Sequence, residues 1–193
     1  MSSLSSSPLR PVSEQEQQAY QRDGAVVLRG LIAPEWIDRM RAAVERALQR
    51  PGVGAVEYAE GKGRFLGDFL LWMRDHDFDD FARRSPLPEI ASALLGGSQV
   101  RLFYDQLLVK EPNTQEETPW HQDLPYWPVH GNDILSLWVP FDRVTAESGA
   151  MRYVKGSHAA GALYQPTPFG RNSGFASVLA AADLPPFPDT SAF

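Results

Sequence analysis

The sequence predicts an α+β fold, mainly β in its second half, in which helices come first and strands follow. In the first half, apolar residues recur with the helical period between residues that cap helices. After the Gly-Gly pair at 96–97, β-rich segments alternate with turn residues, and no long helix intervenes. A chain of 193 residues with 43% hydrophobic residues has the size and composition of one globular domain. This order of elements favours strands that form a sandwich or a barrel.

The helices are predicted from their caps and their period. Ser13 and Glu16 match a capping box, which opens a helix that Gly24 ends. Pro34 occupies the favoured first position of a second helix, whose apolar stripe we interpret as core packing. The residues of that stripe are Trp36, Met40, Val44 and Leu48. Two short helices split by "SPLP" are expected between residues 77 and 95.

The strands are predicted from β-branched and aromatic runs that end in turn residues. "AVVLRG" at 25–30 is the first expected strand, and the glycine-rich segment 52–67 is expected to be irregular. The later strands are expected at 100–110, 133–141 and 149–156.

Composition narrows the classes of function. The formal charge of −6 comes without a basic block, which disfavours nucleic acid as a partner. The absence of cysteine excludes disulfides, iron–sulfur clusters and thiolate chemistry, so any metal must bind nitrogen and oxygen ligands. Neither a membrane-spanning apolar run nor a secretory signal is found, so we expect a cytoplasmic protein without a membrane partner. We expect a disordered serine-rich leader at 1–12 and a single domain at 13–193.

One short stretch, "TPWHQDLPYWPVHG" at 118–131, combines a histidine and an aspartate two residues apart. In a β-strand His121 and Asp123 would point the same way and Gln122 the opposite way. An imidazole and a carboxylate suit a divalent metal, and two histidines with one carboxylate are typical of non-haem Fe(II) oxygenases. The alternative is a hydrogen-bonded pair at the end of a strand. The aromatic residues expected to line a partly apolar pocket are Tyr104, Trp120, Tyr126 and Trp127.

The chain resembles the phytanoyl-CoA dioxygenase family of Fe(II)- and 2-oxoglutarate-dependent oxygenases. The similar segments are "RDGAVVLRGLIAPEWIDRMRAAVERAL", "YDQLLVKEP", "TPWHQDLPYWP" and "SLWVPFDRVTAESGAMRYVKGSH". The resemblance implies a double-stranded β-helix (jelly roll, cupin-like) with flanking N-terminal helices. It also implies that His121 and Asp123 bind Fe(II), that 2-oxoglutarate is the co-substrate, and that a small molecule is hydroxylated at an unactivated C–H bond. An aspartate at 123 favours hydroxylation over halogenation, because a small residue there would leave a coordination position for halide.

The resemblance also suggests residues for the co-substrate. Lys110, Gln106 and Trp138 match positions around the co-substrate and the metal, and Arg64 in "GRFLGDF" is a candidate partner for a carboxylate. Solvated side chains are the alternative for Lys110 and Arg64, and core packing is the alternative for Trp138.

The chain departs from the family after residue 158. The family's distal histidine and the arginine that follows it are absent, since no histidine follows His158. We therefore expect a truncated form, incomplete at the C-terminus, with a weak metal site and little turnover. His158 and His130 are candidate substitutes for the missing ligand. We expect His158 to follow the motif by too few strands to face His121 across the barrel. We expect His130 to lie in a solvated turn. His76 is interpreted as a surface histidine.

Two other functions stay open at this point. One is a catalytically silent jelly-roll module that retains part of a metal site and binds a ligand. The other is a cupin-type enzyme that needs no 2-oxoglutarate, which is disfavoured because such sites use more histidines than this chain offers. The sequence does not fix the substrate or the oligomeric state.

Overall fold

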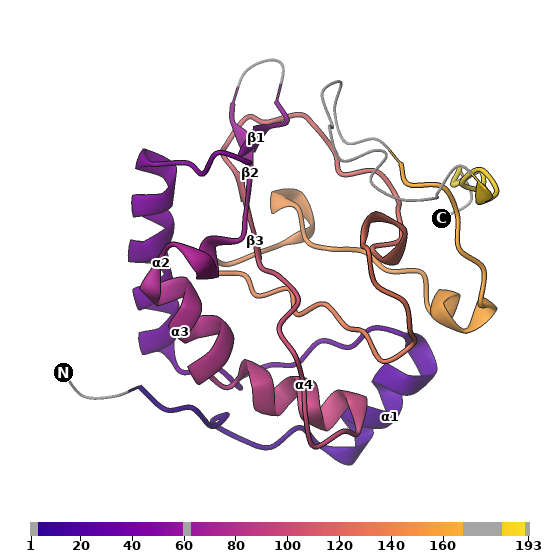
Figure 1. Ribbon diagram of the computed structural model, residues 1–193, viewed down its shortest axis with the longest axis horizontal. Helices are drawn as coiled ribbons and strands as arrows, with labels where there is room; N and C mark the ends of the chain where they lie inside the picture. Colours follow the sequence, from indigo (N-terminus) through magenta and orange to yellow (C-terminus); the bar gives the residue numbers. More distant parts are fainter. Residues whose placement is uncertain (1–3, 60–62, 168–182, 192–193) are drawn as a thin grey trace. The chain divides into compact units, whose positions relative to one another are not determined.

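The computed structural model describes residues 4–59, 63–167 and 183–191 (Figure 1). The chain divides into two compact units. The first unit comprises Met1–Gly52, Phe69–Gln106 and Asp133–Ala159, and the second comprises Val53–Asp68, Leu107–Asn132 and Ala160–Phe193. None of the helices within the described ranges combines the length and the apolarity needed to cross a membrane.

The first unit begins with helix α1 (Glu14–Asp23), whose predicted caps are confirmed. The Ser13 side chain accepts the Glu16 N–H, and the Glu16 carboxylate accepts the Ser13 N–H at 2.9 Å. Gly24 ends the helix in the left-handed region at φ 76°. A Cβ added at Gly24 would lie only 2.4 Å from Nδ1 of His158, so close packing as well as backbone conformation favours glycine there.

Residues ahead of α1 are bonded to the helical part of the first unit. The Trp36 Nε1–H donates to the Ser5 carbonyl at 2.8 Å. The Arg10 guanidinium donates two hydrogen bonds to the Glu16 carboxylate, at 2.7 and 2.8 Å. The hydrogen bonds from Arg10 and from the Ser13 backbone lower the pKa of Glu16 to about 2. The division into a leader and a domain stays a prediction.

The remaining α-helices follow the predicted order: they are α2 (Pro34–Gln49), α3 (His76–Arg84) and α4 (Leu87–Leu95). The short 3-10 helices η1 (Leu71–Met73), η3 (Ala146–Ser148) and η4 (Ser157–Ala160) were not predicted. Helix α3 packs against α2, α4 and η1, and α4 contacts α1. The apolar stripe of α2 is core packing, as predicted, because Trp36 and Met40 are buried. Ser85, between α3 and α4, donates to the Phe81 carbonyl and accepts the Leu87 N–H, which stabilises the break that "SPLP" predicts.

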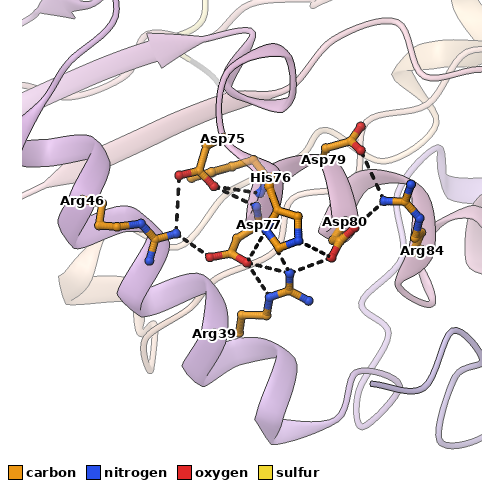
Figure 2. Close-up of polar contacts among 9 residues, drawn as sticks. Arg39, Arg46, Asp75, His76, Asp77, Asp79, Asp80 and Arg84 are labelled. Carbon is orange, nitrogen blue, oxygen red and sulfur yellow. Dashed lines mark hydrogen bonds and ion pairs between the residues drawn. The ribbon is translucent and has the colours of Figure 1, made fainter. Parts of the chain in front are cut away.

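An ionic cluster joins α2 to α3 (Figure 2). Arg39 binds Asp77 and Asp80, each at 2.6 Å, and Arg46 also binds Asp77. Burial by itself would raise the pKa of Asp77, but the hydrogen bonds from Arg39 and Arg46 hold that pKa below its ordinary value. His76 contacts the carboxylates with a side chain that is 79% exposed, which agrees with the predicted surface histidine.

The strand predicted at 25–30 does not form. No ladder involves these residues in the described part of the chain, although Val26 and Leu28 pack on a core of Val12, Leu31, Ile90 and Leu94 while Val27 is 70% exposed. The apolar residues at 25–30 therefore alternate between half-buried and exposed positions, but the segment pairs with no other strand in the described part of the chain. Burial needs only a neighbouring surface, whereas a ladder needs a second extended backbone.

A three-stranded sheet lies largely in the second unit. Its strands are β1 (Val56–Glu57), β2 (Phe65–Phe69) and β3 (Gln106–Lys110), in the order β1-β2-β3, with β1 antiparallel to β2. The expectation that 52–67 is irregular is thus wrong for β1 and the start of β2. Four successive residues of β2 are buried, so the strand shows no alternation, and Gly67 is required because a Cβ there would lie 2.6 Å from the Tyr58 ring.

Of the three later strands, only part of the first forms. Gln106–Lys110 is a strand, whereas 133–141 and 149–156 carry no strand in the structure. Both segments have the composition of strands, but the described residues provide no ladder for them. The structure therefore shows helices with a small antiparallel sheet.

Candidate metal centre

His121 and Asp123 converge in the second unit. Their Nε2 and Oδ1 atoms lie 3.2 Å apart, with His121 17% exposed and Asp123 46% exposed. The convergence does not come from strand alternation. Asp123 has helical dihedral angles (φ −70°, ψ −44°) and precedes the turn η2 (Leu124–Tyr126). The two side chains therefore meet, as the sequence pattern predicts, but the predicted strand geometry is wrong.

The hydrogen bonds of His121 show what the pair can bind. Nδ1 lies 2.8 Å from the Pro119 carbonyl oxygen, which only accepts, so Nδ1 carries a proton. In neutral His121, Nε2 therefore presents a lone pair to the carboxylate of Asp123. Two acceptors at that separation need a cation between them, either a proton or a metal ion.

The separation of the two atoms fits a metal. Nitrogen and oxygen ligands that lie about 2.1 Å from a divalent ion, at right angles to each other, are about 3.0 Å apart. Metal-binding histidines commonly donate their second ring N–H to a backbone carbonyl, which fixes the tautomer. The contact between His121 and Pro119 has this form, so the donor set fits two adjacent positions on one ion.

The pKa of His121 agrees with a preference for positive charge. Burial lowers this pKa, but the hydrogen bonds to Asp123 and to the Pro119 carbonyl, with the charge of Asp123, raise it above its ordinary value. The environment of the pair therefore stabilises a cation at Nε2.

His130 and His158 are the two other histidines that the sequence offers as ligands. Within the described ranges, no group of three or more His, Asp or Glu side chains is arranged to hold a metal ion. His130 is exposed. His158 belongs to the first unit, where its Nε2 lies 3.0 Å from the Gln21 carbonyl oxygen. The exposure of His130 agrees with the expected solvated turn. The expectation that neither histidine substitutes for the distal ligand stays a prediction.

Three of the four predicted pocket aromatics lie in the second unit with His121 and Asp123, which we call the metal pair. The Tyr126 ring meets the His121 ring edge to face at 5.9 Å, and its hydroxyl donates to the Thr167 carbonyl. Burial, together with the charge of Asp123, raises the pKa of Tyr126 to about 12, so the hydroxyl remains a donor. Trp120 and Trp127 are half-buried on either side of the motif in sequence. Tyr104 lies in the first unit, where it packs edge-on against Phe103.

The predicted co-substrate residues divide between the units. Lys110 and Arg64 belong to the second unit. The Lys110 ammonium donates to the Glu116 carbonyl at 2.7 Å, and burial lowers its pKa. Arg64 lies 3.4 Å from Glu57. Neither cation is therefore a purely solvated side chain. Gln106 and Trp138 belong to the first unit, and Trp138 is 43% exposed rather than packed in a core.

The sequence did not predict a set of hydrogen bonds that joins residues 120–122 to residues 162–167. Gln122 donates to the Ala162 carbonyl at 2.8 Å and accepts the Tyr164 N–H at 3.0 Å. Thr167 donates to the Trp120 carbonyl at 3.1 Å. The sequence predicted only that Gln122 points away from its neighbours, and no local signal identifies partners some forty residues further along the chain.

The chain is similar to a known protein family and to several curated proteins. The family described as Phytanoyl-CoA dioxygenase (PhyH) matches residues 20–182. Peroxisomal phytanoyl-CoA dioxygenase of Mus musculus is 25% identical over 158 residues, which are 75% of this chain and 47% of that protein. L-proline trans-4-hydroxylase of Streptomyces griseoviridis is 29% identical over 152 residues, 74% of this chain and 54% of that protein. Ectoine dioxygenase of Bordetella bronchiseptica is 26% identical over 154 residues, 76% of this chain and 50% of that protein.

The chain spans about half the length of these curated relatives. No solved structure matches it significantly.

Proposed function

The chain belongs to the phytanoyl-CoA dioxygenase family, and from this premise we propose that it acts as an Fe(II)- and 2-oxoglutarate-dependent oxygenase that hydroxylates a small molecule at an unactivated C–H bond. The names of the relatives, which are dioxygenases and a hydroxylase, support the reaction class. A double-stranded β-helix as the complete fold and a cytoplasmic location belong to the same proposal.

The observation that carries the proposal is the arrangement of His121 and Asp123. The Pro119 carbonyl fixes the His121 tautomer, so that Nε2 presents a lone pair 3.2 Å from Oδ1 of Asp123. Fe(II) bound there, together with 2-oxoglutarate, supplies the activation of dioxygen. One neutral and one anionic ligand leave a net positive charge on a divalent ion, which favours binding of an anionic co-substrate.

The chain's cations and aromatic residues take supporting roles in the proposal. Lys110 has lost part of its hydration, and a partly desolvated ammonium gains more from an anionic partner than a fully solvated one. We therefore assign it, with Arg64, to the carboxylates of 2-oxoglutarate. From the resemblance to the family, we assign Gln106 and Trp138 to the surroundings of the co-substrate. The aromatic residues assigned to the substrate pocket are Tyr104, Trp120, Tyr126 and Trp127.

Anaerobic titration of the full chain with Fe(II) and then 2-oxoglutarate tests the proposal. Chelation of the iron by the 2-oxo acid produces a visible charge-transfer band. For the wild type we expect a weak band that requires excess Fe(II), because two protein ligands hold the ion weakly. His121→Ala and Asp123→Ala should abolish the band. His130→Ala is the matched control, because it removes an exposed histidine seven residues from Asp123, and it should retain the band. Absence of the band in wild type and control alike would overturn the proposal.

A catalytically silent binding module is the second candidate, and one observation favours it. The described residues provide no third His, Asp or Glu beside the pair, and two ligands impose a coordination geometry poorly. Succinate formation separates the two functions. An oxygenase converts 2-oxoglutarate to succinate in the presence of Fe(II) and dioxygen, whereas a silent module binds its ligands and forms none.

A further inference from the structure

Side chains tie residues 162–167 to the stretch that contains the metal pair. The four bonds run from Gln122 to the Ala162 carbonyl, from the Tyr164 N–H to Gln122, from Tyr126 to the Thr167 carbonyl, and from Thr167 to the Trp120 carbonyl. All of these residues lie in the second unit. We call residues 162–167 the strap.

Gln122 makes two of the four bonds. Its amide donates to one backbone carbonyl and accepts from one backbone N–H of the strap, at 2.8 and 3.0 Å. A peptide group in a β ladder would use the same two kinds of partner. The side chain of Gln122 thus replaces a ladder at a place where residues 118–122 form no regular secondary structure.

The position of Gln122 makes this tie relevant to the metal pair. It is the residue between the two ligands, so fixing its Cα limits how far the backbone of either ligand can turn. The side chain of Asp123 is 46% exposed, so restraint of its backbone contributes to the orientation of its carboxylate. Tyr126 and Thr167 add a second tie just beyond the pair, where the Tyr126 ring also packs against His121.

We propose that the strap orients the metal pair and that Gln122 is its positioning residue. This inference rests on the proposed function, since it assumes that His121 and Asp123 bind a metal. Gln122 itself does not touch the ion. It acts by holding Nε2 of His121 and Oδ1 of Asp123 at the separation that two adjacent ligands require.

Co(II) titration of the full chain, followed by visible absorption, tests the inference, because the Co(II) spectrum reports coordination geometry independently of turnover. Gln122→Met keeps the length of the side chain and removes both bonds. Loss of an outer hydrogen-bond partner typically weakens metal affinity about 10- to 100-fold. We expect a loss in that range, together with an altered Co(II) spectrum.

Gln165→Met is the matched control. Gln165 lies in the strap and its amide donates to the Leu184 carbonyl at 2.8 Å, but it makes no bond to the metal motif in the described part of the chain. It should keep the wild-type affinity and spectrum. If Gln122→Met lowers only the unfolding midpoint and keeps both wild-type metal properties, Gln122 is structural and the inference is wrong.

A second variant keeps the test decisive if Gln122→Met does not fold. Thr167→Val preserves side-chain shape and removes only the bond to the Trp120 carbonyl. We expect a smaller loss of Co(II) affinity with a spectral change, and an unchanged spectrum and affinity would overturn the inference. The two levels of failure are distinguishable. A wild-type chain that binds no Co(II) removes the proposed function, whereas a binding wild type with unaffected variants removes only the role of the strap.

Discussion

Asp105, at the entry to β3, carries a carboxylate whose burial should make the stability of the protein depend on pH. Its Oδ2 accepts the Trp72 N–H at 3.0 Å. Its Oδ1 is buried and accepts no hydrogen bond from the part of the chain that the structure describes. Burial raises the pKa of Asp105 from its ordinary 3.8 to about 6, even though the bond from Trp72 lowers it. The perturbation that isolates this effect is Asp105→Asn, which removes the titration and keeps an acceptor for Trp72.

The magnitude follows from the raised pKa. Between pH 3.8 and about 6 the folded protein holds a proton on Asp105 that the unfolded chain has released. Stability therefore falls as pH rises through this window, and the full penalty is present above it. A difference of about two pH units corresponds to about 3 kcal/mol. Since Asn does not titrate, the stability of Asp105→Asn relative to wild type should increase by about 3 kcal/mol from pH 3 to pH 8.

Urea unfolding of wild type and variant across this pH range measures the effect. A constant offset caused by placing an amide N–H where Oδ1 now lies does not matter, because only the change in the difference with pH is used. Asp38→Asn controls for the loss of one negative charge, since the Asp38 side chain is 74% exposed and is hydrated in both states. A difference between Asp105→Asn and wild type that stays flat from pH 3 to pH 8 would refute the buried carboxylate.

Four further substitutions test the packing, the cap at Gly24 with its neighbour His158, and the ionic cluster. Gly67→Ala places a Cβ 2.6 Å from the Tyr58 ring and should cost about 1 to 3 kcal/mol in urea unfolding, so a neutral result would contradict the close contact. Gly24→Ala should cost more than about 1 kcal/mol because of its positive φ and the His158 ring, whereas His158→Ala should leave Co(II) affinity unchanged; a lower affinity would revive it as a ligand. Arg39→Met should cost about 2 kcal/mol, less in high salt, because two carboxylates lose their shared partner; equal unfolding midpoints would show that the cluster adds nothing.

The helices were predictable because their signals are local. The capping box at Ser13 and Glu16, the Pro34 start and the "SPLP" break each act within a few residues, and all of them appear in the structure. Strands depend on partners that lie far away in sequence. The start of β2 was missed because Phe65–Asp68 is continuously buried and shows no alternation. Strand β1 has only two residues, which is too short for a periodic signal. The segments at 25–30 and 133–141 have strand composition without a ladder in the described residues.

In the candidate site, the convergence of His121 and Asp123 was predictable from their residue types and spacing. Their binding of a metal stays a prediction, as does the role of Lys110 that the resemblance to the family suggests. The tie through Gln122 was not predictable, because its partners in the strap are about forty residues away and are backbone atoms, which any residue type can supply. The same limit applies to the Pro119 carbonyl. A sequence shows which side chains are available, but it does not show which backbone N–H and carbonyl groups they hydrogen-bond in the folded chain.

The four histidines of the chain show how much this distinction matters. His76 lies among carboxylates but its side chain is exposed, and His130 is exposed as well. His158 is bonded to a backbone carbonyl through Nε2, yet its Nδ1 faces the backbone of Gly24 rather than a carboxylate. Only His121, among the four, has one ring nitrogen held by a carbonyl while the other faces a carboxylate from within a half-buried environment. Where both conditions hold, a divalent cation is the favoured occupant, because the first fixes where the lone pair is and the second supplies negative charge.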